Sequence, residues 1–140
     1  MMNDERGTMS KNGDRDLRLR TRAFALRIIR LYASLPKTTE AQVIGKQLLR
    51  SGTSVGAHYM EATRARSIPE FVSKIEGGLQ ELEETIYWLQ LLIDSGIQTK
   101  KRLEPLCAEA NELVAIFVSS VRTAKKRTKN SSFIVHHSSL

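Results

Sequence analysis

The sequence is short of the residues that would cross-link a chain or carry it into a membrane. It contains one cysteine, Cys107, so an internal disulfide is excluded. No apolar run approaches the ~20 residues that a membrane-spanning helix needs. The charged N-terminus also lacks the apolar stretch of a signal peptide. We therefore expect a cytoplasmic protein with no membrane partner.

Aromatic residues make up only 6% of the 140 residues, and alternating runs of Val, Ile, Thr and Tyr are scarce. Because such runs mark β-strands, a sheet is not expected. The apolar fraction is 41%, and Leu, Ala, Glu, Arg and Lys dominate, which favours a globular helical protein. A single domain is the simplest organisation at this length, and it is large enough to bury a core without disulfides or metal.

The sequence also lacks a recognisable catalytic or metal-binding pattern. There is no GxGxxG, P-loop or HExxH motif. The residue three positions before each of His58, His136 and His137 is apolar, so the Glu-x-x-His pairs of di-iron bundles are absent. Cys107 lies between Leu and Ala, which favours a structural thiol over a nucleophile. We expect no enzyme activity, no cofactor and no metal site.

Apolar residues recur at helical spacing in four segments of the chain. The first runs from about residue 14 to 35 and is ended by Pro36. The second opens near Thr39, where Thr39 and Gln42 have the T-x-x-Q spacing of a capping box. These signals predict two helices joined by a short link.

The third segment has the clearest start. Ser67 and Glu70 have the spacing of a capping box, and Pro69 lies in the first turn, where its missing N–H costs nothing. Gly96 ends this helix, and the fourth begins near Thr99.

The links between the four segments are short, and short links make consecutive helices antiparallel. The fold prediction is an all-α, antiparallel, up-down-up-down four-helix bundle over residues 14–127. Residues 1–13 and 128–140 have no helical period, so we expect them to be flexible.

Glycines lie on one flank of the second helix. Gly45, Gly52 and Gly56 fall together beside its apolar stripe. Each costs about 0.5–1 kcal/mol relative to alanine, and a smooth flank allows the close approach of another backbone. One interpretation is tight packing inside the bundle. The other is a seam with a second subunit, for which Gly52 and Gly56 are candidates.

The third helix carries apolar residues away from its core face. Tyr87, Trp88 and Leu91 lie 120–220° from the core-facing residues on the helical wheel. A two-sided apolar helix often buries its second face against another subunit. Glu81 and Glu84 border this face and would meet the basic helices of a neighbouring copy. Such a contact joins different surfaces, so it predicts a ring.

Charge is distributed unevenly along the chain, whose net charge is +7. Residues 15–66 hold eleven Lys or Arg and three Asp or Glu. Residues 67–95 hold one Lys and six Asp or Glu. Residues 122–140 hold five basic residues and no acid. This asymmetry suits a self-assembling ring, a nucleic-acid binder, or both.

Two sets of basic residues are candidates for binding anions. Lys and Arg at the start of the fourth helix oppose its dipole, as they would at an anion site. This anion-binding candidate consists of Lys100, Lys101 and Arg102. The candidate nucleic-acid-binding residues, to which the basic tail adds, are Arg22, Arg27, Arg30, Lys46, Arg50, Arg64 and Arg66.

Two adjoining stretches carry a family resemblance. LLRSGTSVGAHYMEATRARS (48–67) and EFVSKIEGGLQELEETIYWLQLL (70–92) closely resemble the bacterial four-helix-bundle family called 23S ribosomal RNA intervening-sequence proteins. The resemblance extends over about residues 20–125. The sequence departs from the family where His58 replaces the usual Asn, and where Gly77 and Gly78 replace an Ala-rich helix.

The resemblance implies homopentameric rings of bundles. It also implies kinship with the accessory proteins of diversity-generating retroelements, which are basic barrels that bind nucleic acid and a reverse transcriptase. A reverse-transcriptase-like partner is therefore expected from resemblance alone.

Two functional hypotheses follow. The first is a non-enzymatic, ring-forming protein that binds RNA or DNA through phosphates. The alternative is a protein-interaction scaffold whose charged surfaces serve only homo-oligomer assembly. Arg50 and Arg64 discriminate between them, because pairing with Glu81 or Glu84 of a neighbouring copy favours the scaffold, and unpaired arginines favour nucleic acid.

Overall fold

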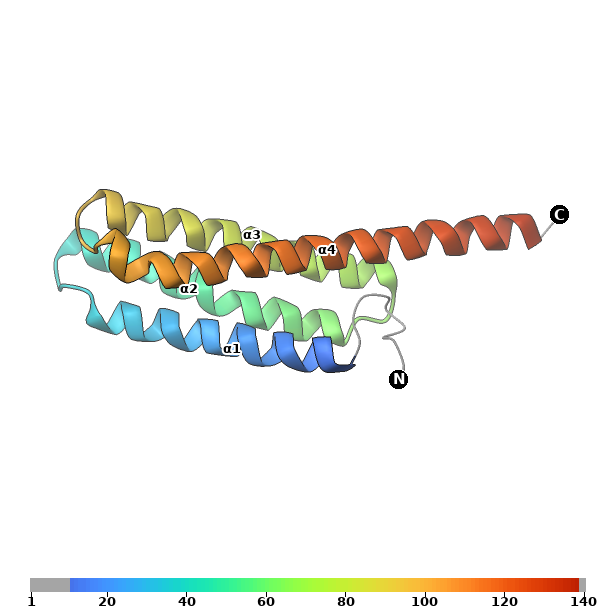
Figure 1. Ribbon diagram of the computed structural model, residues 1–140, viewed down its shortest axis with the longest axis horizontal. Helices are drawn as coiled ribbons and strands as arrows, with labels where there is room; N and C mark the ends of the chain where they lie inside the picture. Colours follow the sequence, from blue (N-terminus) through green and yellow to red (C-terminus); the bar gives the residue numbers. More distant parts are fainter. Residues whose placement is uncertain (1–10, 139–140) are drawn as a thin grey trace.

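The structure is a computed structural model that describes residues 11–138, with side chains up to residue 130. It contains four helices: α1 (Lys11–Ser34), α2 (Thr39–Thr63), α3 (Ile68–Asp94) and α4 (Lys100–Ser138). They run alternately up and down as one elongated bundle (Figure 1). The described residues contain no strand. The four-helix-bundle prediction is confirmed.

The packing between helices follows their order along the chain. α2 and α3 share the most extensive contact, α3 packs on α4 and α1 packs on α2, while α1 and α4 touch least. The core between them includes the fully buried rings of Phe24 and Phe117 and the aliphatic side chains of Leu48 and Leu82. α2 and α3 thus form the central pair against which the outer helices are held.

Helix capping agrees with the sequence at one helix and differs at another. Ser67 caps α3 and accepts the N–H of Glu70, and Gly96 follows the helix with a φ of 78°, as predicted. At α2 the cap is Thr38, whose hydroxyl accepts the N–H of Ala41. The predicted Thr39–Gln42 box is therefore wrong by one residue. Both Thr38 and Thr39 suit a cap chemically, so sequence alone does not choose between them.

α4 is longer than the sequence period indicates. The bundle was expected to end at residue 127, but α4 continues to Ser138, and its last turns project beyond the link between α2 and α3 (Figure 1). At the other end of the chain, α1 starts at Lys11, earlier than the expected residue 14, and residues 1–10 lie outside the described part.

None of the helices in the described part of the chain is both long and apolar enough to pass through a membrane.

Candidate nucleic-acid interface

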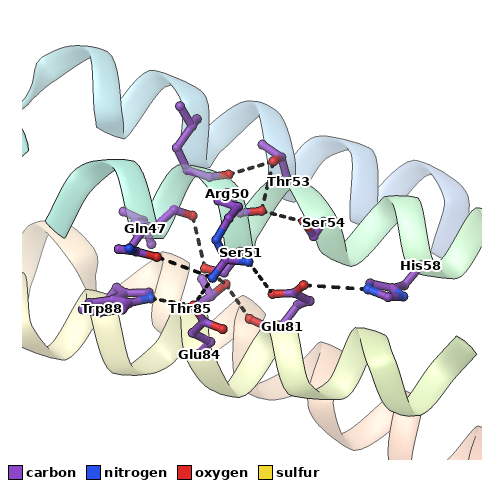
Figure 2. Close-up of polar contacts among 12 residues, drawn as sticks. Gln47, Arg50, Ser51, Thr53, Ser54, His58, Glu81, Glu84, Thr85 and Trp88 are labelled. Carbon is purple, nitrogen blue, oxygen red and sulfur yellow. Dashed lines mark hydrogen bonds and ion pairs between the residues drawn. The ribbon is translucent and has the colours of Figure 1, made fainter. Parts of the chain in front are cut away.

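A polar network fills the seam between α2 and α3 (Figure 2). Arg50 on α2 forms an ion pair with Glu84 on α3, and its Nη1 lies 3.6 Å from Oε1 of Glu81. Glu84 also accepts the indole N–H of Trp88 at 3.2 Å. The Glu81 side chain is only 17% exposed and that of Arg50 is 53% exposed. Arg50 thus neutralises a half-buried acidic patch within its own subunit.

This network corrects two predictions. Glu81 and Glu84 were expected to meet basic residues of a neighbouring copy, but their partner is Arg50 of the same chain. Arg50 was expected to be a free cation for nucleic acid, and the two carboxylates engage it instead. The antiparallel direction of α2 and α3 alone does not indicate this pairing, because it also depends on how the two helices are rotated against each other.

The two departures from the family pattern lie against each other in the same seam. Nε2 of His58 is 3.7 Å from Oε2 of Glu81, and Nδ1 is 3.9 Å from Oε1 of Glu61. A Cβ added at Gly77 would lie 2.8 Å from the imidazole. Gly77 therefore forms a notch in α3 that accommodates the ring of His58.

The glycines on α2 pack inside the subunit. A Cβ at Gly52 would lie 2.7 Å from Ile28 of α1, and one at Gly45 would lie equally close to Leu35. A Cβ at Gly56 would lie 3.3 Å from the hydroxyl of Thr21, also on α1. The interpretation as packing inside the bundle is therefore correct. Gly52 is buried beneath α1, so its assignment to a subunit seam is wrong, and the same packing accounts for Gly56.

The remaining candidate cations lie on the surface and do not form one patch. Three of them, Arg22, Arg27 and Arg30, lie along α1. Lys46 lies on the first half of α2, and Arg64 and Arg66 lie at the link between α2 and α3. Arg27 is half-buried and the other five are exposed. Within the described residues none of the six has a carboxylate within ion-pair distance.

The side chain of Thr99 caps the start of α4. The hydroxyl of Thr99 accepts the backbone N–H of Arg102 at 3.2 Å, and the guanidinium of Arg102 donates to the hydroxyl of Ser34 at 3.3 Å. Lys100 and Lys101 are exposed. The predicted anion site thus has its nearest backbone donor occupied, which leaves its two lysines as surface charges.

The candidate interface on α3 is partly exposed. The Tyr87 side chain is 56% exposed and lies edge-on to the ring of Trp88, with ring centroids 5.0 Å apart. Trp88 and Leu91 are half-buried, and Trp88 packs on the core. The two acidic residues Glu83 and Asp94 are exposed at positions flanking Tyr87.

A second exposed apolar face lies on α1 and was not predicted. Leu19, Leu26 and Ile29 are 59%, 42% and 44% exposed. They share a helical face with Arg22 and Arg30 that points away from the core. The signal was present in the sequence, since Leu19 and Leu26 are seven residues apart and Ile29 follows three later. It was obscured by the arginines between them.

Two further predictions concern chemistry. Burial, and then the negative charge of Glu104, raises the pKa of the Cys107 thiol, which accords with a structural rather than a nucleophilic residue. The residues that the structure describes include no group of three or more His, Cys, Asp or Glu side chains able to hold a metal ion.

Comparison with known proteins agrees with the resemblance in the sequence. The model of the family described as 23S rRNA-intervening sequence protein matches residues 15–119. The crystal structure of a protein with unknown function from the S23 ribosomal protein family of Bacteroides thetaiotaomicron superposes with a TM-score of 0.74 at 36% sequence identity. That similarity covers 79% of this chain and 98% of the other. No curated protein matches the sequence.

Proposed function

The chain belongs to the family of 23S rRNA-intervening sequence proteins, and on this premise we propose that it is a self-assembling protein that binds nucleic acid through phosphates. The observation that carries the proposal is the imbalance of surface charge. Glu81 and Glu84 pair with Arg50, whereas five exposed cations and the half-buried Arg27 have no acidic partner among the described residues. Unpaired surface cations attract a polyanion and release its counterions on binding.

The proposed contact is electrostatic and tolerant of sequence. The exposed cations outside the apolar face of α1 are spread over α2 and the α2–α3 link, so they suit an extended backbone rather than a single phosphate. Tyr87 is the one exposed aromatic among the described large hydrophobics, and acids flank it. Stacking of bases on aromatic rings is therefore not part of the proposal.

Self-assembly is the second part of the proposal. The exposed apolar face of α1 lies between arginines, and that of α3 around Tyr87 lies between Glu83 and Asp94. Docking α1 of one copy against α3 of the next would cover both faces and pair Arg22 and Arg30 with these acids, which leaves Lys46, Arg64 and Arg66 as the exposed cations for nucleic acid. Because the two surfaces differ, the contact can repeat from copy to copy, and it forms a ring when the rotation between copies closes; the resemblance implies five copies.

The scaffold hypothesis has one specific observation in its favour. Arg50, one of the two discriminating arginines, is engaged by carboxylates, although they belong to its own subunit. The other, Arg64, is exposed, with no ion pair among the described residues. The charge of Arg50 at the α2–α3 seam thus stabilises the contact between the two helices, and the charge of Arg64 at the α2–α3 link is available for a ligand.

A binding titration with generic RNA and generic duplex DNA tests the proposal. Affinity should fall steeply between 50 and 200 mM salt, by roughly 10³-fold or more if about six phosphates are contacted. Arg64→Gln and Arg50→Gln remove the same charge, so they form a matched pair. Arg64→Gln should weaken binding more, because Arg50 is already neutralised. Absence of binding at the lower salt concentration would refute the nucleic-acid function and leave the scaffold.

A further inference from the structure

The projecting part of α4 lies outside the region shared with the family. The family match ends at residue 119, whereas α4 continues to Ser138. We call the part of this extension whose side chains are described, residues 120–130, the basic arm. It holds five Lys or Arg residues, and no Asp or Glu follows Glu112 anywhere in the chain. A large share of the net charge of +7 is therefore carried by a segment that follows residue 119, where the match to the family model ends.

Three cations of the basic arm form a ladder on one face of the helix. Arg122, Lys126 and Lys129 have i, i+4, i+7 spacing, which places them within about 60° of one another. All three are exposed, and within the described residues none has a carboxylate in ion-pair distance. Val121 and Ala124 are buried on a different face, so burial of the arm against the bundle leaves the ladder free.

Lys125, which lies beside the ladder in the arm, has an acidic partner. Lys125 reaches Glu76 of α3, with Nζ 3.4 Å from Oε2, at the edge of a groove between the start of α3 and the arm. Lys129 lines the same groove but is not within ion-pair distance of Glu76, and Arg122 and Lys126 do not line it. Within the arm, the charge of Lys125 is therefore balanced locally, whereas the charges of the three ladder residues are not.

The spacing of the ladder suits a phosphate backbone. Seven residues of α-helix rise about 10 Å. Along one strand of a duplex the phosphates advance about 3.4 Å each, so roughly three phosphates fall within that length. The other exposed side chains of the arm include Thr123 and Asn130, which donate hydrogen bonds to phosphate oxygens in many complexes. An interface with an acidic protein would need apolar anchors, and none of the exposed large hydrophobics lies at residues 120–130.

We propose that Arg122, Lys126 and Lys129 form a phosphate-binding ladder that grips the backbone of a nucleic-acid duplex. This inference rests on the proposed nucleic-acid function and assigns a major part of it to a segment outside the family match. Arg64 and Arg66 lie in the link beside which the arm projects, and they extend the same basic end of the bundle (Figure 1).

The test compares two triple variants of the full chain with equal changes in charge. R122Q/K126Q/K129Q removes the ladder, and K100Q/K101Q/R102Q removes three cations from the opposite end of the same helix. Binding of a fluorescent 20-base-pair duplex is measured by anisotropy at several salt concentrations, with DNA and RNA duplexes in parallel. Circular dichroism verifies that both variants retain the helical content of the parent protein. K126Q/K129Q provides a second ladder variant if the triple variant fails that check.

The ladder variant should lose affinity, and its slope of log K against log salt should become shallower by about 2 to 3, because each phosphate contact contributes about 0.9. K126Q/K129Q should show about two thirds of that change, and the opposite-end variant should stay near the parent. Unchanged binding by the ladder variants would overturn the ladder while leaving the proposed function in place. Equal loss of affinity in both triple variants would overturn the ladder, because it would show that binding depends on the total positive charge of the protein and not on these three positions.

Two other outcomes are informative. If the parent protein binds neither duplex at low salt, both the ladder and the proposed function fall. If polyglutamate of similar length displaces the duplex as effectively as unlabelled duplex does, the arm selects charge rather than phosphate. That result would overturn the ladder in favour of an acidic protein partner.

Discussion

At the residue scale, the contact between His58 and Gly77 connects two positions that look unrelated in the sequence. A Cβ at residue 77 would lie 2.8 Å from both Cε1 and Nδ1 of the imidazole, closer than packed atoms approach. The resemblance in the sequence implies the smaller Asn at the position of His58 and an Ala-rich helix at Gly77. The larger ring and the missing side chain therefore compensate each other in volume.

A double-mutant cycle tests this compensation. Gly77→Ala should stabilise the His58→Asn variant by about 0.5–1 kcal/mol, because alanine is the better helix residue and the ring is gone. In the parent protein the gain should vanish or reverse, since the new methyl group displaces His58 from beside Glu81. Chemical denaturation measures all four stabilities.

Gly78→Ala is the control for that cycle. Its Cβ would lie 2.7 Å from the buried ring of Phe117, so it should destabilise the parent and the His58→Asn variant alike. If Gly77→Ala changes the stability of the parent protein and of the His58→Asn variant equally, the proposed compensation between the two residues is wrong.

The Cys107 thiol gives a second prediction at this scale. Its pKa is raised by burial first and by Glu104 second, so less thiolate is present at pH 8 than in the unfolded chain. Alkylation by iodoacetamide should be slower in the folded protein, and its rate should rise with pH through a higher midpoint. Glu104→Gln should shift that midpoint down. A folded-state midpoint at or below that of the denatured chain would contradict the assignment.

At the scale of elements, a bidentate ion pair joins α1 to α4. α1 and α4 share the smallest packing contact in the bundle. Arg20 spans it with two hydrogen bonds to the Glu109 carboxylate, of 2.7 and 3.1 Å, and the side chains are 28% and 18% exposed. The hydrogen bond to Glu109 raises the pKa of Arg20 above its usual value.

Glu109→Gln should therefore destabilise the protein by about 1–2 kcal/mol, since a bidentate and partly buried pair is lost. Glu112→Gln is the matched control. That carboxylate is 3.7 Å from Arg20 and 68% exposed, so its loss should change stability by only a few tenths of a kcal/mol. Urea unfolding of the two variants provides the comparison, and equal effects would show that the bidentate geometry is irrelevant.

The elements also show what sequence could predict. Helical period and the Ser67 and Gly96 signals predicted the number, order and direction of the helices, because those depend on local patterns. The length of α4 escaped prediction because residues beyond 127 carry no apolar stripe, although nothing there breaks a helix. The role of Arg50 escaped because ion pairing between α2 and α3 depends on their relative rotation, which a single helical wheel does not contain.

At the scale of the whole molecule, apolar and charged surface remain that a single copy does not use. Leu19, Leu26 and Ile29 expose one apolar face and Tyr87 another. The excess of positive charge lies on α1, at the α2–α3 link and on the projecting end of α4. The proposed assembly bound to a polyanion would use both features.

Sedimentation velocity of the protein with a labelled RNA duplex tests this central claim most directly. The account predicts that the protein alone sediments as a species several times larger than the 15.8 kDa chain, and that RNA co-sediments with it at 50 mM but not at high salt. Leu26→Lys should shift the protein toward the single subunit, because it places charge on the exposed face of α1. A folded 15.8 kDa monomer that leaves the RNA free at low salt would contradict the account.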